Sequence, residues 1–127
     1  MNDLRTDLSK VRGHGAANEG VHEFITSRVS AMILALVFPF FLYGIMKALP
    51  GGYEGLIAWA KSAFGAFTLL IMVTAGLYHG RIGINEVIAD YVPSTALRSF
   101  LLILNAMVAF GVWLMGVMAI LKIWLGA

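Results

Sequence analysis

The residues SFLLILNAMVAFGVWLMGVMAIL, positions 99–121, contain no charged side chain over 23 residues. Two similar runs precede them, because 18 uncharged residues separate Arg28 from Lys47 and 19 separate Lys61 from Arg81. A helix needs about 17 to 25 predominantly apolar residues to cross the hydrocarbon core of a bilayer. The three runs therefore predict three transmembrane segments.

The composition of the whole chain agrees with this prediction. The 127 residues are 60% hydrophobic and only 13% charged, with a mean hydropathy of +0.85, which is too apolar for an ordinary soluble domain. Backbone groups that face lipid must be bonded within their own segment, and three spans cannot close a barrel. The sequence therefore predicts an all-α fold, an integral membrane bundle of three transmembrane helices.

The expected organisation is a polar amino-terminal tail, residues 1–25, followed by one membrane-anchor domain, residues 26–127. Thr26 or Ser27 would cap the first helix, and Pro39 would kink it, since proline removes a backbone bond. The helices are expected at about 27–49, 53–89 and 95–125.

The orientation follows from lysine and arginine, which collect in cytoplasmic loops. An odd number of spans divides these residues six to three in favour of the amino-terminal side, where His14 and His22 also belong. We therefore expect a cytoplasmic, or matrix-equivalent, amino terminus. The six basic residues are Arg5, Lys10, Arg12, Arg28, Arg81 and Arg98, and the other three are Lys47, Lys61 and Lys122.

Two further features narrow the class of protein. Acidic residues are mixed into the tail, which argues against a mitochondrial targeting peptide and favours a bacterial inner membrane over a mitochondrial one. The chain has no cysteine, so disulfides and thiolate metal sites are excluded. Histidine is then the leading candidate for a metal ligand, and no nucleic-acid partner is expected.

The segment LYHGRIGINEVIADYV, residues 77–92, brings polar groups to the end of the second apolar run. Helical spacing of three and four residues aligns Gly76, His79, Gly83, Glu86 and Asp90 on one face. The glycines would leave room for a flat ring beside a histidine that can bind iron. The same pattern also fits plain helix packing, with the histidine as an interhelical hydrogen-bond partner.

The other polar residues have ordinary explanations as well. Arg28, Arg81 and Arg98 suit anchors at the inner interface, and Asp90 with Tyr91 suits a helix end. Because one chain offers a single strong axial ligand, a haem would need its second ligand from a partner.

Two motifs resemble a known family. Residues 79–91, HGRIGINEVIADY, are similar to the H-x-x-x-G-x-x-x-x-x-x-D-Y signature of the small hydrophobic membrane-anchor subunit of succinate dehydrogenase. Residues 20–31, GVHEFITSRVSA, resemble the G-V-x-D/E-F-x-x-x-R-x-x-A entry to the first helix in that family. A short basic segment, residues 92–98, sits where the family re-enters the third helix, and the first 17 residues match nothing in the pattern.

The resemblance implies a set of partners and cofactors. In this family, two membrane subunits anchor a flavoprotein and an iron-sulfur protein, hold one haem b between them, and form part of the ubiquinone site. His79 would be one axial ligand of the haem iron, with the other from the second membrane subunit, a cytochrome b. Asp90 and Tyr91 would border the quinone site, where Tyr91 donates a hydrogen bond to a quinone carbonyl.

The resemblance also implies supporting roles around the haem. Arg28 and His22 would approach the haem propionates, Ser27 would serve the propionates or the quinone pocket, and Gly76 and Gly83 would allow close packing of the ring. A guanidinium at the membrane boundary suits a carboxylate chemically.

The chain is thus expected to be a non-flavin subunit of a succinate:quinone oxidoreductase, without succinate-oxidising activity of its own. A quinol:fumarate reductase anchor is the nearest alternative. A structural membrane anchor or assembly protein without haem would use the same spans and glycines. A small transporter would be expected to carry polar groups deep in several helices, which the first and third segments lack.

Overall fold

The computed structural model describes residues 6, 8 and 18–126, and these confirm an all-α fold. Most of the predicted tail, including His14, lies outside the described residues. The described elements are α2 (Asn18–Ala48), the short 3-10 helix η1 (Leu49–Gly51), α3 (Gly52–Lys61), α4 (Ala63–Tyr91) and α5 (Thr95–Leu125).

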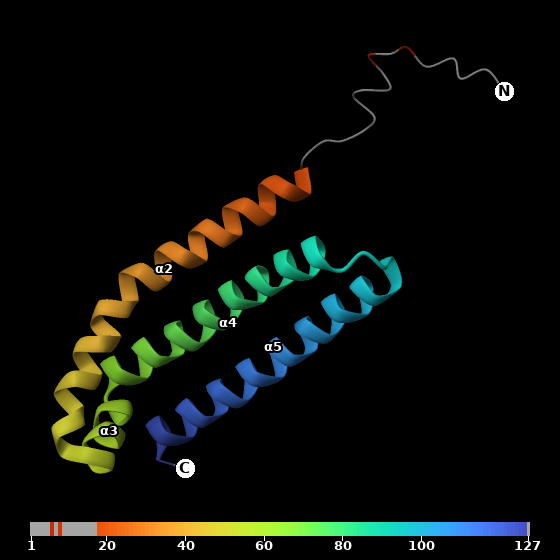
Figure 1. Ribbon diagram of the computed structural model, residues 1–127. Coiled ribbons are helices and arrows are strands. Elements are labelled where there is room, and N and C mark those ends of the chain that lie inside the picture. The colour runs from red at the N-terminus through yellow and green to blue at the C-terminus, as the bar shows by residue number, and fades with distance from the viewer. Residues whose placement is uncertain (1–5, 7, 9–17, 127) are drawn as a thin grey trace.

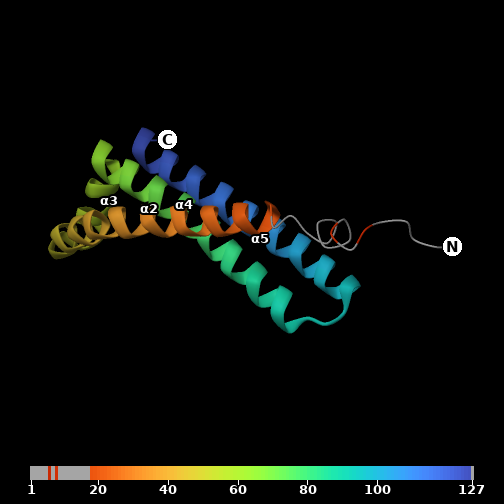
Figure 2. The same ribbon diagram turned by 90° about the horizontal axis from the view of Figure 1, so that it is seen from above.

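The long helices lie side by side with α4 in the middle (Figures 1 and 2). Helix α4 packs against both α2 and α5, whereas α2 and α5 do not contact one another. The short helix α3 lies at one end, where it contacts α2, α4 and α5. The arrangement is therefore an open row of three helices that is braced at one end.

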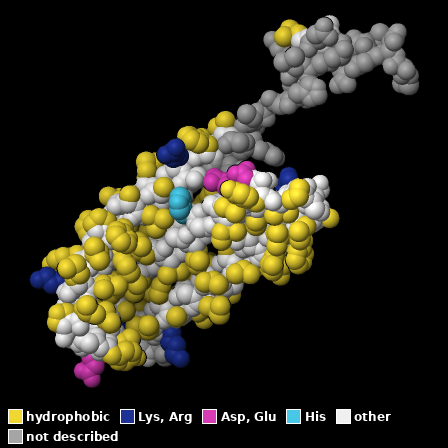
Figure 3. Space-filling view, viewed as in Figure 1, with side chains coloured by type: hydrophobic (Ala, Val, Ile, Leu, Met, Phe, Trp, Pro, Cys, Tyr) yellow, Lys and Arg dark blue, Asp and Glu magenta, His cyan; other side chains and the backbone are white. Residues whose placement is uncertain are grey.

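Three segments are long and apolar enough to cross a membrane, namely Phe24–Lys61, Ala63–Tyr91 and Thr95–Leu125. The first includes the turn at η1, so its crossing part is the portion of α2 from residue 24 to 48. At about 1.5 Å per residue, this portion is roughly 37 Å long. Hydrophobic side chains cover most of the face shown in Figure 3, while charged side chains lie toward its two ends.

Helix α2 begins earlier than the sequence predicts. It starts at Asn18, and the predicted cap at Thr26 or Ser27 is wrong, because both residues lie inside the helix. The Thr26 hydroxyl donates to the carbonyl oxygen of His22 at 2.9 Å, a bond within the helix rather than across its end. The start of the apolar run therefore does not coincide with the start of the helix, which lies before it.

Pro39 lies within α2 and does not end it. The ribbon of α2 bends where its colour passes from orange to yellow, in the region of this proline (Figure 1). Proline cannot donate the helical hydrogen bond at its own position, and its ring crowds the preceding turn. The expected kink is thus present in a continuous helix.

The single helix expected over 53–89 is instead two helices, α3 and α4, separated at Ser62. Ser62 adopts an extended backbone, and its hydroxyl oxygen accepts a hydrogen bond from the Gly65 amide at 3.0 Å. The same hydroxyl donates to the Trp59 carbonyl oxygen at 2.6 Å. One serine thus closes α3 and caps α4.

Glycines allow α3 to fold back closely against α2. A Cβ atom at Gly44 would lie 2.5 Å from the Trp59 ring, and one at Gly55 would press on the carbonyl oxygen of Ala48. Gly52 provides the turn into α3 with a φ of +60°, a conformation that favours glycine. These contacts fix the brace at the end of the row.

Polar side chains join α4 to α5 within the membrane. The Trp113 indole nitrogen donates to the Thr74 hydroxyl oxygen at 3.1 Å. The Asn105 amide nitrogen donates to the Asn85 side-chain oxygen at 2.9 Å and to the Arg81 carbonyl oxygen at 3.0 Å. Such bonds set the register of the two helices where lipid supplies no hydrophobic drive for association.

Candidate functional site

His79 lies on α4 where this helix packs against α2, and its side chain is half-buried. The Nδ1 atom lies 3.1 Å from the hydroxyl oxygen of Ser30, which belongs to α2 and is only 5% exposed. His79 is therefore held between two helices, as the interhelical alternative requires. The bond occupies only one ring nitrogen, so the other can still bind a metal.

The glycines beside His79 do not serve close packing within the described part of the chain. A Cβ atom at Gly83 would meet no atom within 4 Å, and one at Gly76 would meet only the Leu34 side chain at 3.9 Å, an ordinary contact. By comparison, a Cβ at Gly65, at the other end of α4, would press on the Trp59 carbonyl oxygen. The described residues therefore leave open space beside Gly83.

The other predicted haem-site residues lie in the first three turns of α2. Arg28 is exposed, and its guanidinium carbon lies 5.1 Å from the centre of the Phe24 ring. His22 is exposed, whereas Ser27 is half-buried and offers its carbonyl oxygen to the Ser30 hydroxyl at 2.9 Å. These residues therefore lie on the same end of α2 as Ser30, which contacts His79.

Asp90 and Tyr91 form the end of α4, just over one turn beyond Glu86. Both are exposed, and 80% of Tyr91 is accessible. Eleven residues separate His79 from Asp90, which corresponds to about 16 Å along the helix. The structure thus brings His79 and Ser30 together and keeps the Asp-Tyr pair apart from them.

Arg98 holds the loop that follows Tyr91. Its Nε and Nη2 atoms donate to the carbonyl oxygen of Val92 at 3.0 Å and 2.8 Å. Ser94 caps α5 in the same loop, with its hydroxyl oxygen accepting from the Leu97 amide at 3.5 Å. Arg98 therefore has a structural partner within the chain in addition to any role as a membrane anchor.

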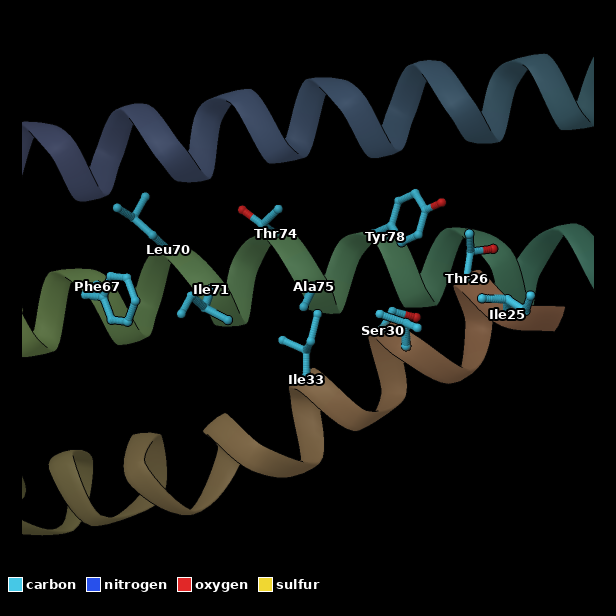
Figure 4. A pocket seen from close by; sticks show the side chains of 11 residues that line it. Ile25, Thr26, Ser30, Ile33, Phe67, Leu70, Ile71, Thr74, Ala75 and Tyr78 are labelled. Atoms are coloured by element: carbon cyan, nitrogen blue, oxygen red, sulfur yellow. The ribbon is translucent and has the colours of Figure 1, made fainter. Parts of the chain in front are cut away.

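An apolar groove of about 540 Å³ runs between α2 and α4 beside Ser30. Ser30 and Ile33 border it from α2, and Ala75 and Tyr78 from α4 (Figure 4). Ser30 therefore lines the groove and also contacts His79.

A comparison with known protein families identifies the family of this chain. The family model described as "Succinate dehydrogenase/Fumarate reductase transmembrane subunit" matches residues 2–120. The chain belongs to the succinate dehydrogenase/fumarate reductase transmembrane subunit family. The resemblance seen in the two sequence motifs is thereby confirmed, and the chain is a membrane-anchor subunit of the succinate dehydrogenase type.

Several curated relatives carry the name "Succinate dehydrogenase hydrophobic membrane anchor subunit". Those from Rickettsia conorii and Rickettsia prowazekii are 31% and 33% identical over 103 residues, covering 80% of this chain and 82% of theirs. The one from Paracoccus denitrificans is 27% identical over 122 residues, covering 96% of this chain and 94% of its own. No solved structure matches the chain significantly. The relatives are bacterial, and with three apolar helices they support a multi-pass membrane protein.

Sequence reasoning missed Ser30. The sequence points instead to Ser27, as a hydroxyl for the propionates or the quinone pocket. The available signal was the spacing of Thr26 and Ser30, which stand four residues apart and hence on one face of α2. Nothing in a single sequence shows that this face turns toward His79.

Proposed function

We propose that this subunit and a second membrane subunit bind one haem b, form part of a ubiquinone-reduction site, and anchor a flavoprotein and an iron-sulfur subunit in a bacterial inner membrane. The observation that carries the proposal is the half-buried His79, held through Nδ1 by Ser30 in a chain of the succinate dehydrogenase family. Family membership indicates the type of complex, and the imidazole of His79 is a group that can bind iron.

The residues present fit a haem better than a bare metal ion. Within the described residues, no three His, Asp or Glu side chains gather as they would around an ion held by protein ligands alone. A haem already holds its iron through four ring nitrogens, so the protein would need to supply only one or two further ligands. His79 would supply one, the partner membrane subunit the other, and the open space beside Gly76 and Gly83 would admit the ring. When bound, the haem supplies one-electron redox chemistry.

Residues of α2 would bind the propionate groups. The guanidinium of Arg28 is exposed and can pair with a carboxylate through two parallel hydrogen bonds. His22 lies six residues earlier, and Ser27 is adjacent to Arg28, so both are close along the helix. These two residues would add weaker contacts to the propionates or to the quinone pocket.

The end of α4 would border the quinone. The exposed phenol of Tyr91 would donate a hydrogen bond to a quinone carbonyl oxygen, orienting the ring and favouring negative charge on that oxygen. The carboxyl of Asp90 would pass protons from water toward the reduced quinone. The hydrogen bonds from Arg98 to Val92 would keep this end of α4 in place.

The direction of electron flow depends on the partners and on the quinone potential. The family model covers succinate dehydrogenase and fumarate reductase together, so a quinol:fumarate reductase anchor is the second candidate. The named relatives favour succinate oxidation.

The proposed orientation places the amino terminus in the cytoplasm. Lys47, Lys61 and Lys122 lie in the last turns of α2, α3 and α5, at the end that carries the brace. Arg28, Arg81 and Arg98 lie toward the opposite end, together with Asp90 and Tyr91. Arg5, Lys10 and Arg12 also precede the first span in the sequence, so the count is six basic residues against three. Because arginine and lysine collect on the cytoplasmic side, the end with six would face the peripheral subunits.

The test uses the complex purified in mild detergent, with two variants. His79→Ala should abolish or shift the reduced-minus-oxidised haem spectrum, because the iron loses an axial ligand. Tyr91→Phe should depress quinone reduction while succinate oxidation by an artificial dye survives. An unchanged spectrum in His79→Ala would contradict the haem assignment, and an equal fall of both activities in Tyr91→Phe would contradict the quinone assignment. Copurification of the other three subunits tests the partners.

A further inference from the structure

The Ser30 hydroxyl makes two hydrogen bonds at the crossing of α2 and α4. It donates to the carbonyl oxygen of Ser27 at 2.9 Å, and it lies 3.1 Å from Nδ1 of His79. Ser30 is only 5% exposed, which leaves little access for competing water. Both contacts are therefore fixed parts of the site.

Counting donors and acceptors indicates which atoms carry the hydrogens in these two bonds. A serine hydroxyl has one hydrogen and two lone pairs, and a backbone carbonyl oxygen can only accept. With the single hydrogen of Ser30 assigned to the bond with Ser27, the hydroxyl oxygen meets His79 with a lone pair. The bond at 3.1 Å then requires a hydrogen on Nδ1.

A neutral imidazole carries only one N–H group. With that hydrogen on Nδ1, the Nε2 atom of His79 keeps its lone pair and is the atom able to bind a metal. A metal-binding histidine commonly donates its second ring nitrogen to a nearby acceptor, which fixes the tautomer and makes the ligating nitrogen more basic. Ser30 supplies such an acceptor from a different helix.

We propose that Ser30 is the positioning residue for His79, selecting the tautomer with hydrogen on Nδ1 and presenting Nε2 to the haem iron. The inference rests on the proposed haem function and adds to it the ligating atom and the residue that controls it. It also makes the packing of α2 on α4 a condition for correct ligation.

The test compares Ser30→Ala, Ser30→Thr and Ser30→Val in the purified complex. Threonine keeps a hydroxyl that can also bond to a carbonyl one turn back, whereas valine has nearly the same shape and no hydroxyl. Thr68→Ala is the matched control, because Thr68 on α4 is 2% exposed and its hydroxyl donates to the Phe64 carbonyl at 2.7 Å. Both deletions remove a buried hydroxyl, but only one removes the acceptor of His79.

Three readouts are independent of enzymatic activity: haem transfer to apomyoglobin, the electron paramagnetic resonance spectrum of the oxidised haem, and the haem midpoint potential. Loss of a metal ligand's hydrogen-bond partner typically weakens metal binding about 10- to 100-fold. We expect Ser30→Ala and Ser30→Val to bind haem more weakly by this factor, with a changed resonance spectrum. Their midpoint potential should rise, because a less basic imidazole stabilises ferric iron less. Ser30→Thr and Thr68→Ala should match the unmodified complex.

The outcomes separate this proposal from the function on which it rests. If Ser30→Val keeps the affinity, spectrum and potential of the unmodified complex while His79→Ala loses haem, Ser30 does not position the ligand, although His79 still binds iron. If His79→Ala also keeps an unchanged haem, the haem assignment itself fails. Should Ser30→Ala fail to accumulate in membranes, the threonine and valine pair decides the question, because these differ only in the hydroxyl.

Discussion

A leucine at Gly83 separates the two explanations for the glycines beside His79. A Cβ atom at this position meets no atom of the described chain within 4 Å, so the described helices leave room for at least the first carbon of a side chain there. Glycine inside a helix is less stable than alanine by roughly 0.5 to 1 kcal/mol. We therefore expect Gly83→Leu to leave the folding of this chain unchanged or slightly improved.

The haem should respond differently. If Gly83 leaves space for the ring, four added carbon atoms would overpack that interface, which typically costs about 1 to 3 kcal/mol. At about 1.4 kcal/mol for each tenfold change, haem binding would weaken about 5- to 150-fold. The haem content per complex and the reduced-minus-oxidised spectrum measure this loss, and an immunoblot of the membranes measures accumulation of the subunit.

Two control variants make the result interpretable. Gly111→Leu adds the same bulk on α5, where a Cβ atom also meets nothing within 4 Å, and should keep its haem. Gly65→Ala would press a methyl group against the Trp59 carbonyl oxygen, so the subunit should accumulate poorly. A normal haem content and spectrum in Gly83→Leu would refute the reasoning about the ring. Poor accumulation like that of Gly65→Ala would show instead that Gly83 serves helix packing.

Two further substitutions test the contacts around α4. Arg98→Lys should raise the KM for quinone several-fold with little change in succinate oxidation by a dye. The reason is that lysine cannot reproduce both bonds to the Val92 carbonyl. Steady-state kinetics that show an unchanged KM would contradict this role. Trp113→Phe should destabilise the subunit by about 0.6 kcal/mol, an average value for a hydrogen bond between membrane helices, through loss of the bond to Thr74. A double-mutant cycle with Thr74→Val, followed by thermal denaturation in detergent, should show that energy as coupling, and additive effects would exclude it.

The third helix was predictable because local chemistry marks both of its ends. Pro93 cannot continue a helix, Ser94 caps the next one, and Lys122 ends the uncharged run that follows. The structure places α5 at Thr95–Leu125, the bounds expected from these residues. The cap residues and the uncharged run are local features of the chain. A single sequence is therefore enough to predict where this helix begins and ends.

The helix boundaries that differ from the prediction are not determined by the hydropathy pattern. Helix α2 begins at Asn18, within the polar segment, so the start of the apolar run does not mark the start of the helix. Ser62 divides the predicted second helix, although serine inside an apolar run is equally compatible with an uninterrupted membrane helix. In the structure, its hydroxyl bonds to residues on both sides.

The candidate site was predictable in part. Helical periodicity placed Gly76, His79 and Gly83 on one face of α4, and this follows from the sequence alone. The contact between His79 and Ser30 joins residues 49 positions apart. It depends on how α2 is rotated against α4, which neither helix encodes by itself.

The open row of helices has a consequence for how freely each segment can vary. Helix α4 contacts α2, α3 and α5 and also carries His79, so a substitution on α4 meets several neighbours at once. Helices α2 and α5 do not touch each other, and many of their large apolar side chains are exposed in the single chain. A saturation mutagenesis scan scored by assembly of the complex should therefore find α4 the least tolerant of the three. On the lipid-facing positions of α2 and α5, leucine, isoleucine, methionine and phenylalanine should be interchangeable.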